Sequence, residues 1–156
     1  MSKDFKHTVF LPKTTFDMRA NLAEKEPKIL DFWNRIGVYE KLRSQSSGKK
    51  SFVLHYGPPY ANGNIHIGHA LSECLKDILN KFMQMNGYDA PMVPGWDCHG
   101  LPIEWKVEEK YKKSKVSKDE VKEEDFVSEC REFAKHWVEV QSNELQRLGT
   151  VSYTHL

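Results

Sequence analysis

The feature that most constrains this chain is an apolar segment that runs into a glycine- and proline-rich loop and then into a long helical pattern. The apolar segment, Ser51–Tyr56, predicts a buried strand, and the loop, Gly57–Asn64, holds too many Pro, Gly and Asn residues for regular structure. We expect a helix from about His66 to Met85 and a second short strand over Ala90–Val93. The order strand, loop, helix, strand is a βαβ unit, which predicts a parallel sheet.

The regions on either side are predicted to be mainly helical. Upstream, apolar spacing predicts a helix over Pro27–Leu42 that Gly37 interrupts, with Pro27 at its first position, and then a polar linker over Ser44–Gly48. Downstream, Ser117–Glu120 has the form of a capping box at the start of another helix. The apolar side chains of that helix repeat at steps of four and three residues and are expected in the core: Phe126, Cys130, Phe133, Trp137 and Val140.

The composition is that of an ordinary globular domain. The 156 residues are 39% hydrophobic and 29% charged, enough for one domain with a hydrophobic core. No apolar stretch approaches the roughly 20 residues that span a bilayer, and Met1–Lys6 lacks the features of a secretory signal. We therefore expect a cytoplasmic protein with no membrane partner. The three cysteines, Cys74, Cys98 and Cys130, are widely spaced and indicate free thiols in a reducing compartment.

The net charge does not identify a partner. The 23 basic and 22 acidic residues give a charge of +1, which neither requires nor excludes nucleic acid. Two local basic clusters, Lys49-Lys50 and Lys110–Lys115, are expected to be solvated loop charges.

Chemistry is expected at the start of the helix that follows the first predicted strand. In a βαβ unit this helix N-terminus binds anions, because free backbone N–H groups and the positive end of the helix dipole point there. His66 and His69 share the first turn, so both imidazoles can reach a bound phosphate. Gly68 has no side chain and lets a flat ring such as adenine approach the backbone. These residues predict a nucleotide site with two phosphate donors.

Other interpretations stay open on the residues alone. A His-x-x-His spacing on a helix can be half of a metal site, although no Glu or further ligand follows at the spacing of zinc proteases. Alternatively, His66 and His69 serve only to cap the helix. Cys98-His99 suggests a thiol nucleophile beside a base, in competition with a purely structural loop.

Three separated segments share their sequence and order with one known family. Gly57–Gly63 reads Gly-Pro-Pro-Tyr-Ala-Asn-Gly, and Pro94–Glu104 reads Pro-Gly-Trp-Asp-Cys-His-Gly-Leu-Pro-Ile-Glu. Upstream, Leu11–Phe16 and Met18–Leu22 read Leu-Pro-Lys-Thr-Thr-Phe and Met-Arg-Ala-Asn-Leu. Together with the His66–His69 run, they resemble class I aminoacyl-tRNA synthetases, and within that family the isoleucyl-tRNA synthetases. Valyl and leucyl enzymes carry different runs before the histidines.

The resemblance implies an α/β fold and a two-step reaction. The fold would be the first half of a Rossmann-like nucleotide-binding domain, with an N-terminal extension and flanking helices. The reaction would be ATP-dependent activation of L-isoleucine to isoleucyl-adenylate, followed by transfer to tRNA(Ile). ATP with Mg²⁺ is the implied cofactor, and a monomer is expected for the full-length enzyme. These residues carry no implied metal site, and any zinc would belong to a C-terminal part of the family's polypeptide.

The resemblance also assigns roles to the site residues. His66 and His69 would be the catalytic pair that binds the ATP phosphates and stabilises the transition state. Gly57 and Pro58 would line the amino-acid pocket, and Asp97 would hold the substrate ammonium unless it only caps a turn. The implied ATP-binding residues are Pro59, Tyr60, Ala61, Asn62, Gly63, Asn64, Ile65, His66, Ile67, Gly68 and His69.

The resemblance covers residues 11–149 and divides the chain into three parts. Residues 1–48 would form an N-terminal extension with a helix, 49–149 the first half of the catalytic domain, and 150–156 a tail that does not match the family. Asp17 stands where the family usually has proline. The family's editing domain and its Lys-Met-Ser-Lys-Ser loop, which also binds ATP, do not occur in these residues. We therefore expect an amino-terminal fragment that is inactive alone.

Three further functions are compatible with parts of the pattern. A valyl- or leucyl-tRNA synthetase fragment would share the fold and the reaction type. A small nucleotidyltransferase also uses a His-x-Gly-His run, but the match over Trp96–Glu104 opposes it. A non-enzymatic His/Cys metal-binding module is the third, and a zinc or nickel titration would test it.

Overall fold

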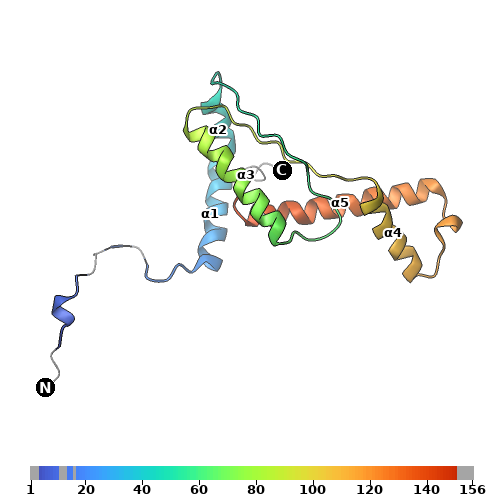
Figure 1. Ribbon diagram of the computed structural model, residues 1–156, viewed down its shortest axis with the longest axis horizontal. Helices are drawn as coiled ribbons and strands as arrows, with labels where there is room; N and C mark the ends of the chain where they lie inside the picture. The colour runs from blue at the N-terminus through green and yellow to red at the C-terminus, as the bar shows by residue number, and fades with distance from the viewer. Residues whose placement is uncertain (1–3, 11–13, 16, 151–156) are drawn as a thin grey trace.

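The computed structural model describes residues 4–10, 14–15 and 17–150, most of which are helical (Figure 1). The family-like segment at 11–16 and the predicted tail at 150–156 fall mostly outside the described residues. The elements in chain order are η1 (Lys6–Thr8), α1 (Leu22–Ile36), α2 (Val38–Ser46), α3 (Ile67–Met85), α4 (Leu101–Lys113), η2 (Lys118–Glu120) and α5 (Glu123–Arg147).

The helix predicted over Pro27–Leu42 forms as two helices. α1 begins earlier, at Leu22, because the run Leu-Ala-Glu-Lys that starts there consists of good helix formers. Pro27 consequently lies inside α1, and its prediction as a first helical residue is wrong. Gly37 ends α1 in the left-handed conformation at φ 58°, and α2 begins directly after it, which confirms the predicted interruption. The polar linker predicted over Ser44–Gly48 is shorter than expected, because α2 runs into it.

The central helix α3 confirms the prediction over 66–85. It begins at Ile67 with His66 as its N-cap, and it ends at Met85. The chain then turns at Gly87, where φ is 87°, a left-handed conformation that glycine adopts without strain. Both ends of this helix therefore lie where the sequence predicts them.

The two predicted strands do not form as regular strands among the described residues. Instead, two extended segments run side by side in parallel, bridged at Ser51 with Asp89 and at Tyr60 with Asp97 (Figure 1). Phe52 N–H donates to the Asp89 carbonyl at 2.8 Å, and Asp97 N–H donates to the Pro59 carbonyl at 2.8 Å. Prolines occupy the segments between and beside the bridges and have no N–H to continue a ladder. The parallel direction is confirmed, but the α/β character is only partly visible.

The C-terminal part departs from the prediction at two places. Lys110–Lys113 lie on the last turn of α4 and not in a loop, where cations suit the negative end of the helix dipole. Ser117 caps only the short η2, by accepting from Asp119 N–H at 3.4 Å, and α5 begins later, at Glu123. Three consecutive acidic residues at that start favour the later position.

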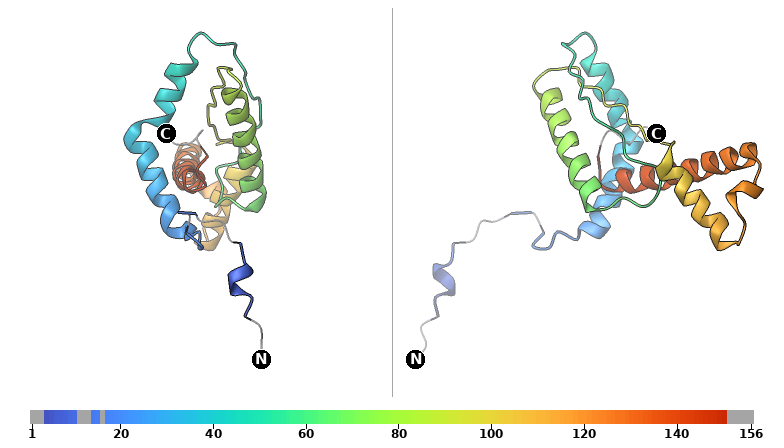
Figure 2. Two further views of the ribbon diagram at one scale, coloured as in Figure 1. Left: turned by 90° about the vertical axis from the view of Figure 1, so that its left-hand side faces the viewer. Right: turned by 45° about the vertical axis from the view of Figure 1, so that its right-hand side comes forward.

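The core is small and centred on α5. α1 and α4 both pack on α5, and Figure 2 shows α5 end-on between α1 and α3. Ala61, Ile103 and Ala134 form the buried centre. The expected apolar stripe packs around it through Cys130, Phe133 and Trp137, Phe126 is buried nearby and Val140 is half-buried, which confirms the stripe as core.

The helix α3 carries its apolar face outward and its polar face inward. The polar residues Glu73, Asp77 and Asn80 are only 4–9% exposed. The Asn80 side-chain amide donates to the Ala90 carbonyl at 2.9 Å, so this face contacts the second extended segment. The exposed apolar side chains of α3 are Ile67, Leu71, Leu75, Ile78, Leu79, Phe82 and Met85.

Candidate nucleotide site

The two histidines at the start of α3 cap the helix reciprocally. His66 Nδ1 accepts from Gly68 N–H at 3.1 Å, and His69 Nδ1 accepts from His66 N–H at 3.2 Å. The imidazole rings stack with their centroids 3.8 Å apart. The capping contacts are therefore present, and they leave the phosphate interpretation open, because each ring keeps a second nitrogen.

The capping bonds also set which nitrogen of each neutral ring carries the proton. A nitrogen that accepts a hydrogen bond cannot carry a proton, so Nδ1 is bare in both rings. A neutral imidazole then carries its proton on Nε2, and each histidine has one N–H left to donate. Burial lowers the pKa of His69, with the neighbouring His66 lowering it further, which favours the neutral form. In these capped tautomers the helix start offers two Nε2–H donors to an anion.

Gly68 is required by the imidazole of His66 itself. A Cβ at position 68 would lie 2.9 Å from Cε1 and 3.0 Å from Nδ1 of His66, closer than real Cβ contacts allow. A side chain here would displace the capping ring. The absence of a side chain at Gly68 therefore makes room for the His66 ring, in addition to the predicted approach of an adenine ring.

The loop before the histidines is fastened to α5 by a buried glutamine. Gln141 is 1% exposed, and its Nε2 donates to the carbonyls of Tyr60 at 3.0 Å and Gly63 at 2.6 Å. Its Oε1 accepts from the Trp96 indole N–H at 3.0 Å. One side chain thereby joins the loop at 60–63 to the segment that contains Asp97.

A glutamate one turn later holds the last residues before the histidines. Glu144 accepts from Ile65 N–H at 2.8 Å and from the Asn64 side-chain amide at 2.6 Å. The sequence alone does not single out Gln141 or Glu144, because a polar residue in a helical pattern normally faces solvent. The only local signal is that Gln141 falls on the buried face, four residues before the fully buried Leu145.

Asp97 lies beside the loop, as the resemblance implies. Its N–H donates to the Pro59 carbonyl, and its carbonyl accepts from Ala61 N–H at 3.0 Å. The side-chain Oδ1 accepts from His99 N–H at 3.4 Å and lies 3.7 Å from His99 Nε2. The turn-capping contact is therefore present, and the proposed contact with a substrate ammonium stays a prediction.

Residues 59–65 of the implied ATP-binding set form the loop, and the rest of the set starts α3. Ala61 is fully buried in the core, whereas Gly57 and Pro58 are exposed. A Cβ at Gly57 or Gly63 would meet nothing within 4 Å, so neither glycine is required by a neighbouring atom.

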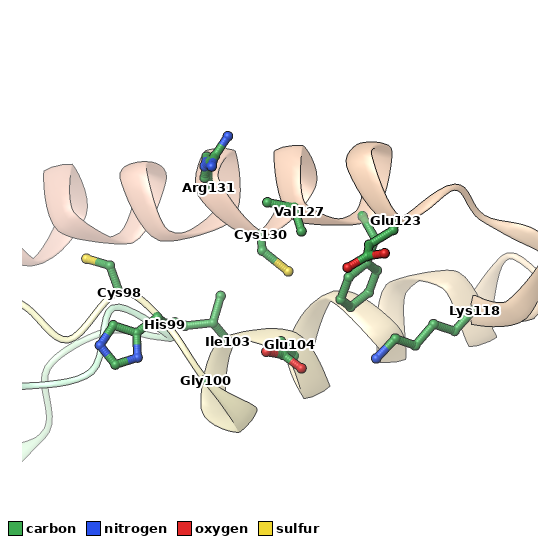
Figure 3. Close-up of a pocket in the computed structure, with 11 residues that line it drawn as sticks. Cys98, His99, Gly100, Ile103, Glu104, Lys118, Glu123, Val127, Cys130 and Arg131 are labelled. Atoms are coloured by element: carbon green, nitrogen blue, oxygen red, sulfur yellow. The ribbon is translucent and has the colours of Figure 1, made fainter.

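The Cys98-His99 pair lines a separate cavity of 510 Å³ between α4 and α5 (Figure 3). Burial raises the pKa of Cys98, as does the charge of Asp97, so the thiol is held protonated. The His99 ring is largely exposed and faces Asp97. This geometry opposes a thiolate nucleophile, in line with the structural interpretation of the pair.

The described residues contain neither a candidate metal site nor a candidate membrane span. No group of three or more His, Cys, Asp or Glu side chains in this part of the chain could hold a metal ion. Within the same residues, no helix is long and apolar enough to span a membrane.

The class of fold follows from a solved structure. The chain superposes with a TM-score of 0.59 and 21% identity on a crystal structure of the ternary complex of Agrobacterium radiobacter K84 agnB2 LeuRS, tRNA and LeuAMS. The match covers 85% of this chain and 14% of that one. The fold is therefore shared with part of a synthetase.

The family follows from the sequence. The model of the tRNA synthetases class I (I, L, M and V) matches residues 28–153, and the chain belongs to this family. It is 58% identical to the isoleucine–tRNA ligase of Pelagibacter ubique over 94% of this chain and 16% of that protein. It is 56% identical to that of Mesorhizobium japonicum, over 95% of this chain and 15% of the relative. The chain thus spans about a sixth of the length of these curated relatives.

Proposed function

We propose that this chain is the phosphate-binding part of an isoleucine–tRNA ligase. The observation that carries the proposal is the reciprocally capped histidine pair at the start of α3, in a chain 58% identical to a curated isoleucine–tRNA ligase. The whole enzyme would form isoleucyl-adenylate from L-isoleucine and ATP and transfer the acyl group to tRNA(Ile). We further propose that it acts as a cytoplasmic monomer and that any zinc site lies outside these residues.

In the first step the isoleucine carboxylate attacks the α-phosphorus and pyrophosphate leaves. Such a reaction is accelerated mainly by positioning and by stabilising phosphate charge. The Nε2–H groups of His66 and His69 supply two fixed donors at the positive end of the α3 dipole. Because each Nδ1 already accepts a backbone N–H, the contribution of each ring is a directional hydrogen bond from Nε2.

The residues around this histidine pair would contact the remaining parts of the two substrates. The loop from Pro59 to Ile65 would follow the nucleotide, and Gly57 with Pro58 would border the side chain of isoleucine. Asp97 would accept the substrate ammonium, since its backbone is bridged to the same loop. Mg²⁺ would share the charge of the ATP phosphates, and we assign it no ligand among the described residues.

The incomplete sheet fits the same proposal. The extended segments at 51–60 and 89–97 would be the first two parallel strands of a Rossmann-like sheet, with α3 as their crossover. A nucleotide would then bind at the loop that follows the first strand, where the histidines lie.

The test is pyrophosphate exchange with the full polypeptide that the gene encodes. Isoleucine is expected to support ATP–pyrophosphate exchange with a higher kcat/KM than valine or leucine. The 156-residue chain alone is expected to show no exchange, because the family's second ATP-binding loop is not among its residues. Preference of the full polypeptide for valine or leucine would refute the assignment to isoleucine. Exchange by the short chain would refute its dependence on the rest of the enzyme.

A further inference from the structure

All hydrogen-bonding groups of the buried Gln141 side-chain amide have partners. Both amide hydrogens donate to loop carbonyls, those of Tyr60 and Gly63, and the amide oxygen accepts from Trp96. Carbonyls can only accept and an indole N–H can only donate, so the partners fix the orientation of the amide. An apolar residue would satisfy the helix pattern at this place but would leave these three groups unpaired.

Glu144 acts on the adjoining part of the loop. It accepts from Asn64 and Ile65, and Ile65 directly precedes the N-cap His66. The two α5 residues thus hold the loop through hydrogen bonds to four of its residues: Tyr60, Gly63, Asn64 and Ile65. No contact of Gln141 or Glu144 with either imidazole is needed for this effect.

We propose that Gln141 and Glu144 are positioning residues that set where His66 and His69 meet a nucleotide phosphate. The inference rests on the proposed function for its catalytic consequence, although the structural effect can be measured without it. A carboxylate this close to an anion site would repel phosphate if it acted through its charge alone. The presence of Glu144 here is explained by the hydrogen bonds that hold Asn64 and Ile65 in place.

The structural part is tested by amide hydrogen exchange in the 156-residue chain. Glu144→Gln keeps the volume of the side chain and removes its charge and one strong acceptor. Exchange at the amides of Ile65 and His66 is expected to accelerate by about tenfold or more, because opening of the loop becomes easier. Glu139→Gln is the matched control, since Glu139 is an exposed glutamate on the same helix. Equal exchange at Ile65 and His66 in the two variants would overturn the inference.

The catalytic part is tested in the full-length enzyme by isoleucine-dependent exchange. Glu144→Gln and Gln141→Met are expected to lower kcat by about tenfold to a hundredfold, as small misplacements of a site do. The KM for isoleucine should stay within about twofold. If Glu144 acted only by charge, its neutralisation would instead lower the KM for ATP with kcat unchanged, which would overturn positioning.

The two failures can be told apart. A wild-type enzyme without isoleucine-dependent exchange refutes the proposed function, while the amide exchange still decides whether the loop is held by α5. If Gln141→Met does not fold, Glu144→Gln decides alone, because Glu144 is only partly buried.

Discussion

At the scale of single residues, the conformations of His66, Gly68 and His69 depend on one another through hydrogen bonds and packing. His66 accepts from Gly68 N–H, His69 accepts from His66 N–H, and the ring of His66 occupies the space above Gly68. Alanine at position 68 should gain roughly 0.5–1 kcal/mol of helix propensity. It should lose about 1 kcal/mol when the cap is displaced. The net change in the free energy of unfolding is therefore expected to be close to zero.

Gly68→Ala is expected to impair phosphate binding without a matching loss of stability. The added methyl would move the His66 ring, which NMR of the imidazole nitrogens would detect as loss of the capped Nδ1 signal. Binding of ATP should weaken by about tenfold. Gly95→Ala is the control, because its Cβ would also meet nothing within 4 Å and Gly95 lies outside the nucleotide loop. An unchanged His66 signal in Gly68→Ala would contradict the argument.

The protonation of His69 gives a pH dependence whose sign can be derived. Burial lowers the pKa of His69 in the folded chain, so the folded state binds this proton less readily than the unfolded state. The cap formed by its Nδ1 is therefore fully present above the ordinary histidine pKa of about 6.5. It is lost as the pH falls through the lowered value.

We expect the free energy of unfolding to decrease as the pH falls below about 6.5 and this cap is lost. His69→Asn, which can cap but does not titrate in this range, should show a smaller decrease. Urea unfolding at several pH values measures both, and equal slopes for the two proteins would exclude His69 as the cause.

At the scale of elements, α3 shows that helical periodicity does not specify which face is buried. Its polar residues face the extended segments, where Lys76 pairs with Glu73 at 2.7 Å and lies 3.7 Å from the centre of the Tyr56 ring. Its apolar residues are exposed, Leu75 by 58%. The stability of the chain should therefore depend little on them.

Leu75→Ala is expected to change the free energy of unfolding by less than about 1 kcal/mol. Leu145→Ala on α5 should cost about 2–5 kcal/mol, because Leu145 is fully buried and its truncation leaves a cavity. Chemical denaturation of the two variants measures the contrast directly. A cost at Leu75 as large as that at Leu145 would mean that the apolar face of α3 is covered in solution.

At the scale of the whole molecule, the sequence by itself determined α3, its capping ends, the irregular loop before it and the family motifs. These follow from spacing within a few residues, and local geometry is sufficient to read them. Only the tertiary structure decided that Gln141 and Glu144 hold this loop, from 78 to 81 residues away along the chain. It also decided that the two predicted strands meet at two bridges only and that the apolar face of α3 is exposed. Such outcomes depend on which elements pack together, and a periodic pattern cannot specify its own partner.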